Sequence, residues 1–187
     1  QMVDEDGDES LLELLPPLTQ DQIDTLQNSC PSPIPDEVKE LLLFSAGFEN
    51  GPIESFDLTG GLPGTGYFDD DMFKDALPIG HDGFGNYWVL DLTPDSKHWG
   101  PVLFLSHDPP CVIYQCNTLA HFVNELIRFG NPPHQSELDD VHEEHSMYVW
   151  KHNPGVMTVA QCKDSGDEDL VSFANELDES WLVIDLR

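Results

Sequence analysis

Histidines and carboxylates are the side chains in this sequence that could do chemistry, and one group of them has the spacing of metal ligands. His142 and His145 lie three residues apart, so a helix would place both imidazoles on one face, with Glu143 and Glu144 between them. Two ligands do not make a zinc site, and a third would have to come from a distant part of the chain. We therefore expect an exposed polar helix here and no bound metal.

Asp82, Asp91 and Asp108 form a second group, which would meet near one loop edge if their turns converge. Such a group could perform acid–base catalysis, but aspartate oxygens more often cap turns by bonding nearby backbone. The sequence contains no phosphate-binding P-loop, nucleophile elbow, HExxH zinc motif or dinucleotide fingerprint. We expect no catalytic residues and no cofactor, and we interpret the chain as a non-enzyme.

The elements that must position these residues begin with helices. Thr19 and Gln22 have the spacing of a capping box, which predicts a helix that carries Ile23 and Leu26. A second helix begins near Pro35 and presents a stripe of apolar residues until Gly47, which we expect to stop it. Apolar residues over 119–127 predict a third helix, which ends at Gly130.

Alternating apolar segments predict strands, joined by short connections rich in Gly, Pro and Asp. Further along, the pattern predicts a polar helix, a strand, another helix and a last strand, which we expect to extend the main sheet. The fold class is α+β, with helices packed on one side of a mostly antiparallel sheet and a C-terminal α/β elaboration. The expected strands are 53–58, 75–79, 86–92, 102–106 and 112–117, and the later elements are 137–147, 156–162, 170–177 and 181–186.

We expect residues 1–15 to be an acidic, partly disordered leader and residues 16–187 to form one domain. Its core would span about 19–130, with 131–187 as an extension. The four cysteines form no CxxC pair, so we expect reduced thiols. No apolar run is long enough to span a membrane and the acidic start is unlike a secretory signal, which favours the cytoplasm.

Charge restricts the partners that this chain can have. Seven Lys and Arg against 36 Asp and Glu give a net charge of 7 − 36 = −29. Such a charge repels nucleic acid and anionic membranes and attracts basic proteins. We therefore expect a basic protein partner, no nucleic acid and no membrane, and we leave the oligomeric state open.

The segment Leu77–Asp91 reads L-P-I-G-x-D-G-x-G-N followed by L-D, with Gly83 and Gly85 forcing a turn between two strands. It stands between a helix start of the type I-P-x-x-x-K-x-L-L (Ile34–Leu42) and a helix of the type T-L-A-x-F-V-x-x-L (Thr118–Leu126). In these motifs and their order, the sequence resembles the SMI1/KNR4 family of the SUKH superfamily. The resemblance implies an α+β fold. It also implies a protein-binding role, either as a bacterial immunity protein that neutralises a toxin, often a nuclease, or as a regulatory scaffold.

An immunity protein of this charge would occlude a basic toxin in a one-to-one complex. Acidic side chains would speed the encounter, and loop aromatics would supply buried contact area. A regulatory scaffold is the alternative, and a metal-dependent hydrolase that uses His142 and His145 is a third. The expected partner-binding residues are Tyr67, Phe68, Asp69, Asp70, Asp71, Asp82, Trp99 and Asp108.

Overall fold

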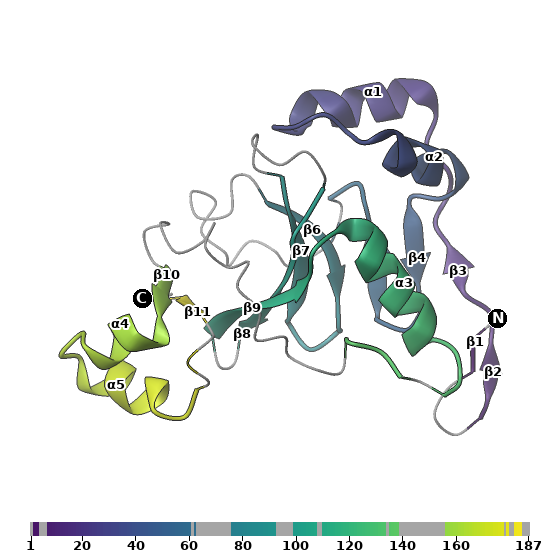
Figure 1. Ribbon diagram of the computed structural model, residues 1–187. Coiled ribbons are helices and arrows are strands. Elements are labelled where there is room, and N and C mark those ends of the chain that lie inside the picture. Colours follow the sequence, from purple (N-terminus) through teal and green to yellow (C-terminus); the bar gives the residue numbers. More distant parts are fainter. Residues whose placement is uncertain are drawn as a thin grey trace.

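Nine strands form one antiparallel sheet that crosses the molecule from the C-terminal region to the N-terminal region (Figure 1). The computed structural model describes residues 2–3, 7–60, 62, 76–92, 99–107, 110–133, 135–138, 156–177, 179 and 182–184. Strands β4 to β9 follow one another in chain order, as a meander. The α+β fold class and the antiparallel sheet predicted from the sequence are therefore confirmed.

The sheet begins and ends with strands from the two ends of the chain. β11 pairs with β9, so the C-terminal strands extend the main sheet, and β3 pairs with β4 at the opposite end. The order across the sheet is β10 (Val156–Thr158), β11 (Leu182–Ile184), β9 (Pro110–Cys116), β8 (Val102–His107), β7 (Tyr87–Asp91), β6 (Ala76–His81), β5 (Ser55–Asp57), β4 (Gly47–Glu49) and β3 (Glu13–Leu14).

The helices are α1 (Gln20–Ser29), α2 (Asp36–Phe44), α3 (Leu119–Phe129), α4 (Val159–Lys163) and α5 (Glu168–Ala174). Local capping explains where several of them start. The Thr19 hydroxyl accepts a bond from the Gln22 amide at 3.3 Å, and the Thr118 hydroxyl accepts one from the His121 amide at 3.2 Å. These bonds satisfy amides that the first helical turn leaves without a partner.

One hydrophobic core joins α1, α2 and α3 to the sheet. Its centre is aromatic, because the ring of Phe122 on α3 lies 6.2 Å from that of Phe56 and 5.9 Å from that of Trp88. Trp88 in turn faces Phe104 across the β7–β8 pair, at 4.9 Å between ring centroids. A second cluster of Val159, Cys162, Ala174 and Val183 holds α4 and α5 against β11.

Two local predictions differ from the structure. Gly47, expected to end the second helix, begins β4, a strand that the sequence did not reveal. The expected strand 156–162 stops at Thr158, whose side chain and Gln161 form a capping box that starts α4. Within residues 1–15, expected to be a partly disordered acidic leader, β1 (Met2–Val3) pairs with β2 (Glu9–Ser10), and the expected limits of the leader stay a prediction. The expected polar helix at 137–147 lies almost wholly outside the described residues.

Candidate functional site

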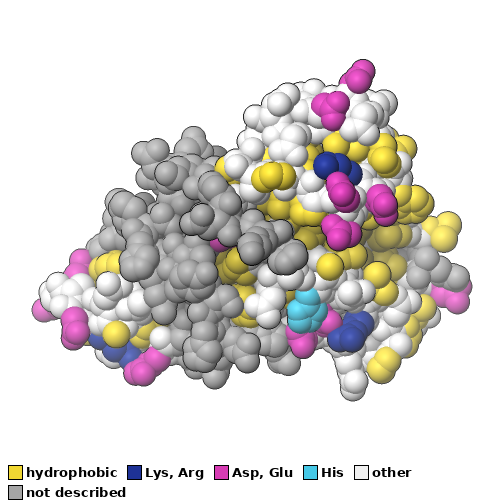
Figure 2. All heavy atoms as spheres, turned by 45° about the horizontal axis from the view of Figure 1, so that its top comes forward, with side chains coloured by type: hydrophobic (Ala, Val, Ile, Leu, Met, Phe, Trp, Pro, Cys, Tyr) yellow, Lys and Arg dark blue, Asp and Glu magenta, His cyan; other side chains and the backbone are white. Residues whose placement is uncertain are grey.

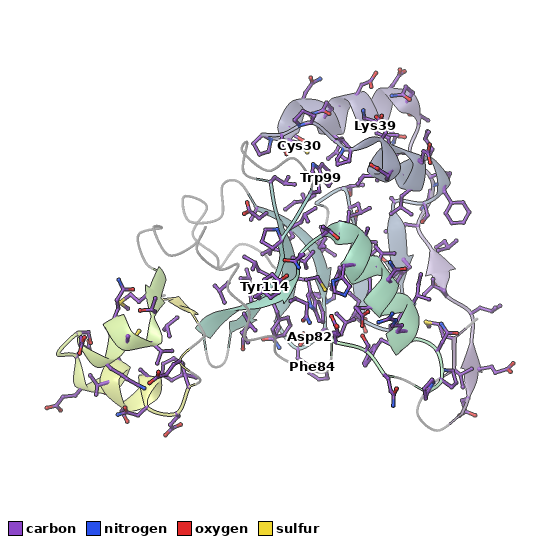
Figure 3. All side chains as sticks on the ribbon, viewed as in Figure 1. Cys30, Lys39, Asp82, Phe84, Trp99 and Tyr114 are labelled. Carbon is purple, nitrogen blue, oxygen red and sulfur yellow. The ribbon has the colours of Figure 1, made fainter. Side chains whose placement is uncertain are left out.

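The turn between β6 and β7 presents Asp82 and Phe84 at one end of these central strands of the sheet (Figure 3). One Asp82 carboxylate oxygen accepts bonds from the amides of Phe84 at 2.8 Å and Asn86 at 3.2 Å. The other oxygen accepts a bond from the Asn86 side-chain amide at 2.6 Å. Gly83 and Gly85 have positive φ angles of 81° and 96°. Asp82 therefore fixes the conformation of the turn, as turn-capping aspartates do.

Phe84 occupies the tip of this turn and is 82% exposed. The neighbouring Glu54 side chain lies against the same turn, because its Cγ is 3.5 Å from the position that a Cβ on Gly83 would occupy. The turn thus holds an aromatic ring in solvent beside two carboxylates. This combination is suited to a basic partner, since the ring supplies area to bury and the acids attract cations. Phe84 was not among the residues predicted from the sequence, although its place between two glycines of a turn was a signal of exposure.

Trp99, expected among the partner-binding residues, is buried and only 4% exposed. Its indole nitrogen donates a hydrogen bond to the carbonyl oxygen of Pro33 at 3.1 Å, beneath the two N-terminal helices (Figure 3). The prediction that Trp99 lies on a binding surface was therefore wrong. The ring belongs to the core that joins α1 and α2 to the sheet.

The remaining expected site residues divide between two outcomes. Asp91 is buried at one end of β7, whereas Asp82 precedes its other end, so the structure does not bring these carboxylates together. Several expected residues lie outside the described residues, and their partner-binding or ligand roles stay predictions. These residues are Tyr67, Phe68, Asp69, Asp70, Asp71, Asp108, His142 and His145.

His121, Glu125 and Glu137 form a cluster in which one potential ligand atom of each lies within 4.8 Å of the others. Glu125 is buried, and its oxygens accept bonds from Arg128 at 2.7 Å, the Ser136 hydroxyl at 3.2 Å and the Glu137 amide at 2.8 Å. A buried carboxylate needs partners of this kind to offset its lost hydration. We assign the cluster the role of fastening residues 135–138 to α3.

Glu125 and Glu137 also affect the pKa of the Cys116 thiol, which is buried on β9. Burial raises the pKa of its thiol to about 12, and the charges of Glu137 and Glu125 act in the same direction. We expect iodoacetamide at pH 8 to modify half-exposed Cys30 in the native protein and to leave Cys116 unmodified until urea unfolds the chain. Peptide mapping by mass spectrometry measures both sites.

The raised pKa also predicts how stability changes with pH. The unfolded thiol loses its proton near its ordinary pKa of 9.0, while the folded thiol keeps it until about 12. The contribution of the protonated Cys116 thiol to the free energy of unfolding is therefore fully present below pH 9 and is lost between pH 9 and pH 12.

In the alkylation experiment, equal rates for Cys116 and Cys30 in the native protein would contradict the burial of the Cys116 thiol.

A groove of about 290 Å³ lies between α2, α3 and the edge strand β3. Its lining is almost entirely apolar and includes Leu14, Phe44 and Ile127, which are all exposed large hydrophobic residues. Hydrophobic side chains gather on this side of the molecule in Figure 2. Contiguous exposed apolar surface of this kind often marks a protein-binding site. The groove could not be predicted from the sequence, because its walls come from three separate segments.

The described surface has little unpaired positive charge. Each Lys or Arg in the described part of the chain lies beside a carboxylate: Lys39 with Asp36 at 3.1 Å, Arg128 with Glu125 at 2.7 Å, and Lys163 with Glu179 at 3.5 Å. Negative charge therefore dominates the described surface, in keeping with the net charge of −29.

Comparison with known protein families gives a match over more than half of the chain. The model of the SMI1/KNR4 family (SUKH-1) matches residues 17–125, which run from just before α1 into α3 and include the Asp82 turn. Neither the curated proteins nor the solved structures include a significant match. Among the described residues, no helix is both long and apolar enough to cross a membrane.

Proposed function

The chain belongs to the SMI1/KNR4 family, and from this membership and its charge we propose that it is a non-enzymatic protein-binding module that acts as an immunity protein. Its partner would be a basic toxin, such as a nuclease delivered between competing bacteria. The net charge of −29, with the described cations held in ion pairs, is the observation that carries this proposal.

The physical argument starts from what a nuclease must present. An enzyme that binds phosphates needs a basic surface, and a strongly acidic protein is drawn to that surface in competition with nucleic acid. The chain would cover the toxin's substrate site in a one-to-one complex. Acidic groups would accelerate association, and exposed rings would slow dissociation by burying apolar area.

Phe84 is one anchor that the described surface offers for this complex. Burying a Phe side chain stabilises a complex by about 2 kcal/mol, and the rigid turn means that little conformational freedom is lost on binding. Glu54 and Asp82 would lie at the rim of the contact. The expected loop residues 67–71 and Asp108 remain part of the proposed surface.

The test is to co-express the chain with the protein encoded by the adjacent gene and to measure growth rescue and complex formation at increasing salt. We expect tight binding whose association rate falls with salt, and growth only when both proteins are made. Phe84→Ser should weaken binding about tenfold or more, mainly through faster dissociation. Leu43→Ser is the matched control, because Leu43 is exposed on α2, away from the turn.

A regulatory scaffold is the second candidate, and the apolar groove favours it. A partner that docks by burying Phe44 and Ile127 would bind with little dependence on salt, because apolar burial involves no screened charges. Binding to a cellular partner that persists at high salt, together with no growth rescue by the adjacent gene pair, would overturn the immunity proposal in favour of this role.

A further inference from the structure

We propose that the free edge of β3 and the groove beside it bind an extended segment of a partner, in which apolar and basic side chains alternate, as an added antiparallel strand. This inference rests on the protein-binding role proposed above, which the immunity protein and the scaffold share, and it names the chemistry of the segment that docks. It concerns a different surface from the Phe84 turn, which lies on the β6–β7 connection.

One side of the β3 backbone carries hydrogen-bonding groups that point away from β4 and can pair with an added strand. Among the described residues, β3 pairs with β4 alone and is the last strand of the sheet. The Leu15 amide donates to the Gly47 carbonyl at 2.9 Å, so Glu13, two residues earlier, occupies the next hydrogen-bonded position, opposite Glu49. In an antiparallel ladder the residue between them, Leu14, directs its amide and carbonyl away from β4. These groups can pair with another strand.

Side chains on one face of this edge create an apolar surface for the incoming strand. Leu12 and Leu14 share that face, because side chains alternate along a strand, and both line the groove. Phe44 on α2 and Ile127 on α3 form its opposite wall, and Phe44 is 68% exposed. Met2 contributes to the lining, next to Gly130. A strand paired with β3 would place every second side chain over this groove.

The other face of the same edge carries two glutamates, which would attract positive charge. Glu13 and Glu49 are direct cross-strand partners, and both are exposed. Like charges opposite each other destabilise a strand pair, and Lys39, Arg128 and Lys163 are engaged with carboxylates elsewhere. The side-chain amide of Asn50 reaches Glu13 at 3.4 Å, but it carries no charge. Basic side chains of an added strand would lie beside Glu13 and relieve this repulsion.

A second copy of this chain is the competing occupant, since two β3 edges could pair with each other. That arrangement would bring the two Glu13 carboxylates close together and would join two chains of net charge −29. Both effects oppose association at low salt. The charge of this edge therefore favours a basic segment over self-association.

The test uses acetylated peptides in which lysine alternates with valine, with binding followed by calorimetry at low salt. Cross-strand neighbours share a face, so the valines lie opposite Leu12 and Leu14 and direct their amides toward β3. N-methylation of the valines should abolish binding, whereas N-methylation of the lysines should preserve it. A peptide in which glutamate replaces lysine should not bind. Retention of affinity by both methylated peptides would overturn strand addition.

Two variants locate the peptide on the protein. Phe44→Ser should weaken binding about tenfold, whereas Leu43→Ser, which alters the adjacent exposed residue of α2 outside the groove, should change it less than about twofold. Equal effects of the two variants would contradict docking in the groove. Sedimentation should show a monomer, and a dimer that Phe44→Ser dissociates would overturn the proposal in favour of a second copy. Growth rescue tests the immunity role separately, so either proposal can fail without the other.

Discussion

Gly47→Ala should lower the free energy of unfolding by more than about 3 kcal/mol, through backbone strain together with a clash that cannot relax. Gly47 has a φ angle of 155°, and a Cβ at this position would overlap the carbonyl oxygen of Phe56 and lie 2.7 Å from its carbonyl carbon. Those atoms belong to β5, which pairs with β4 at this point. Neither strand can move away without breaking the ladder that joins them.

Gly166→Ala is the matched control for this prediction. Gly166 also has a positive φ, of 74°, but a Cβ there would meet nothing within 4 Å. Its cost should be the conformational strain alone, about 1 kcal/mol. Urea denaturation of both variants measures the difference. Equal losses would show that φ strain, and no clash with Phe56, accounts for the requirement for glycine at position 47.

The same substitution should also disturb the proposed docking edge. The Gly47 carbonyl accepts the bond from Leu15 that fixes the register of β3, and the Ser45 hydroxyl links Gly47 to the Leu15 carbonyl. Displacement of Gly47 would therefore displace β3. We expect any folded Gly47→Ala protein to bind the lysine–valine peptide more weakly than the unchanged chain.

Phe122→Ala should cost about 3–5 kcal/mol of unfolding free energy, the range for removal of a fully buried aromatic side chain. Phe122 has no exposed surface, and its ring contacts both Phe56 and Trp88. The cavity would open where α3 meets the centre of the sheet. Rigid strands surround the site, so the structure can collapse little to fill it.

Ile127→Ala on the same helix is the control, because Ile127 is exposed and its truncation leaves no cavity. We expect it to cost less than about 1 kcal/mol. Urea denaturation measures both variants on the same scale. A Phe122→Ala variant no less stable than Ile127→Ala would contradict the packing of α3 on the sheet.

Local signals in the sequence account for the elements that were predicted correctly. Thr19 with Gln22 marks the start of α1, and the turn at Gly83 and Gly85 separates two strands close to the expected limits. Each of these signals acts over a few residues, through capping bonds or through backbone angles that glycine permits. The family motifs consist of the same elements in a fixed order.

Predictions failed where two local interpretations competed. Val156–Cys162 alternates like a strand, but Thr158 and Gln161 also form a capping box, and the pairing of β10 with β11 ends at that threonine. Gly47 is a plausible helix stop, yet the chain turns directly into β4 because Phe56 and Asp57 offer a pairing strand. The strand that decides such a case lies too far along the chain for a local pattern to reveal it.

The sequence by itself determined the charge, the family and the antiparallel meander, because these depend on residue types, on their order and on short-range signals. Only the tertiary structure decided which aromatic rings are exposed to solvent. Trp99 is buried because its indole reaches Pro33, 66 residues away, whereas Phe84 stays exposed at the tip of a turn. The groove is likewise tertiary, since β3, α2 and α3 each contribute one wall. Exposure depends on which distant segments pack over a side chain, and the pattern of neighbouring residues does not contain that information.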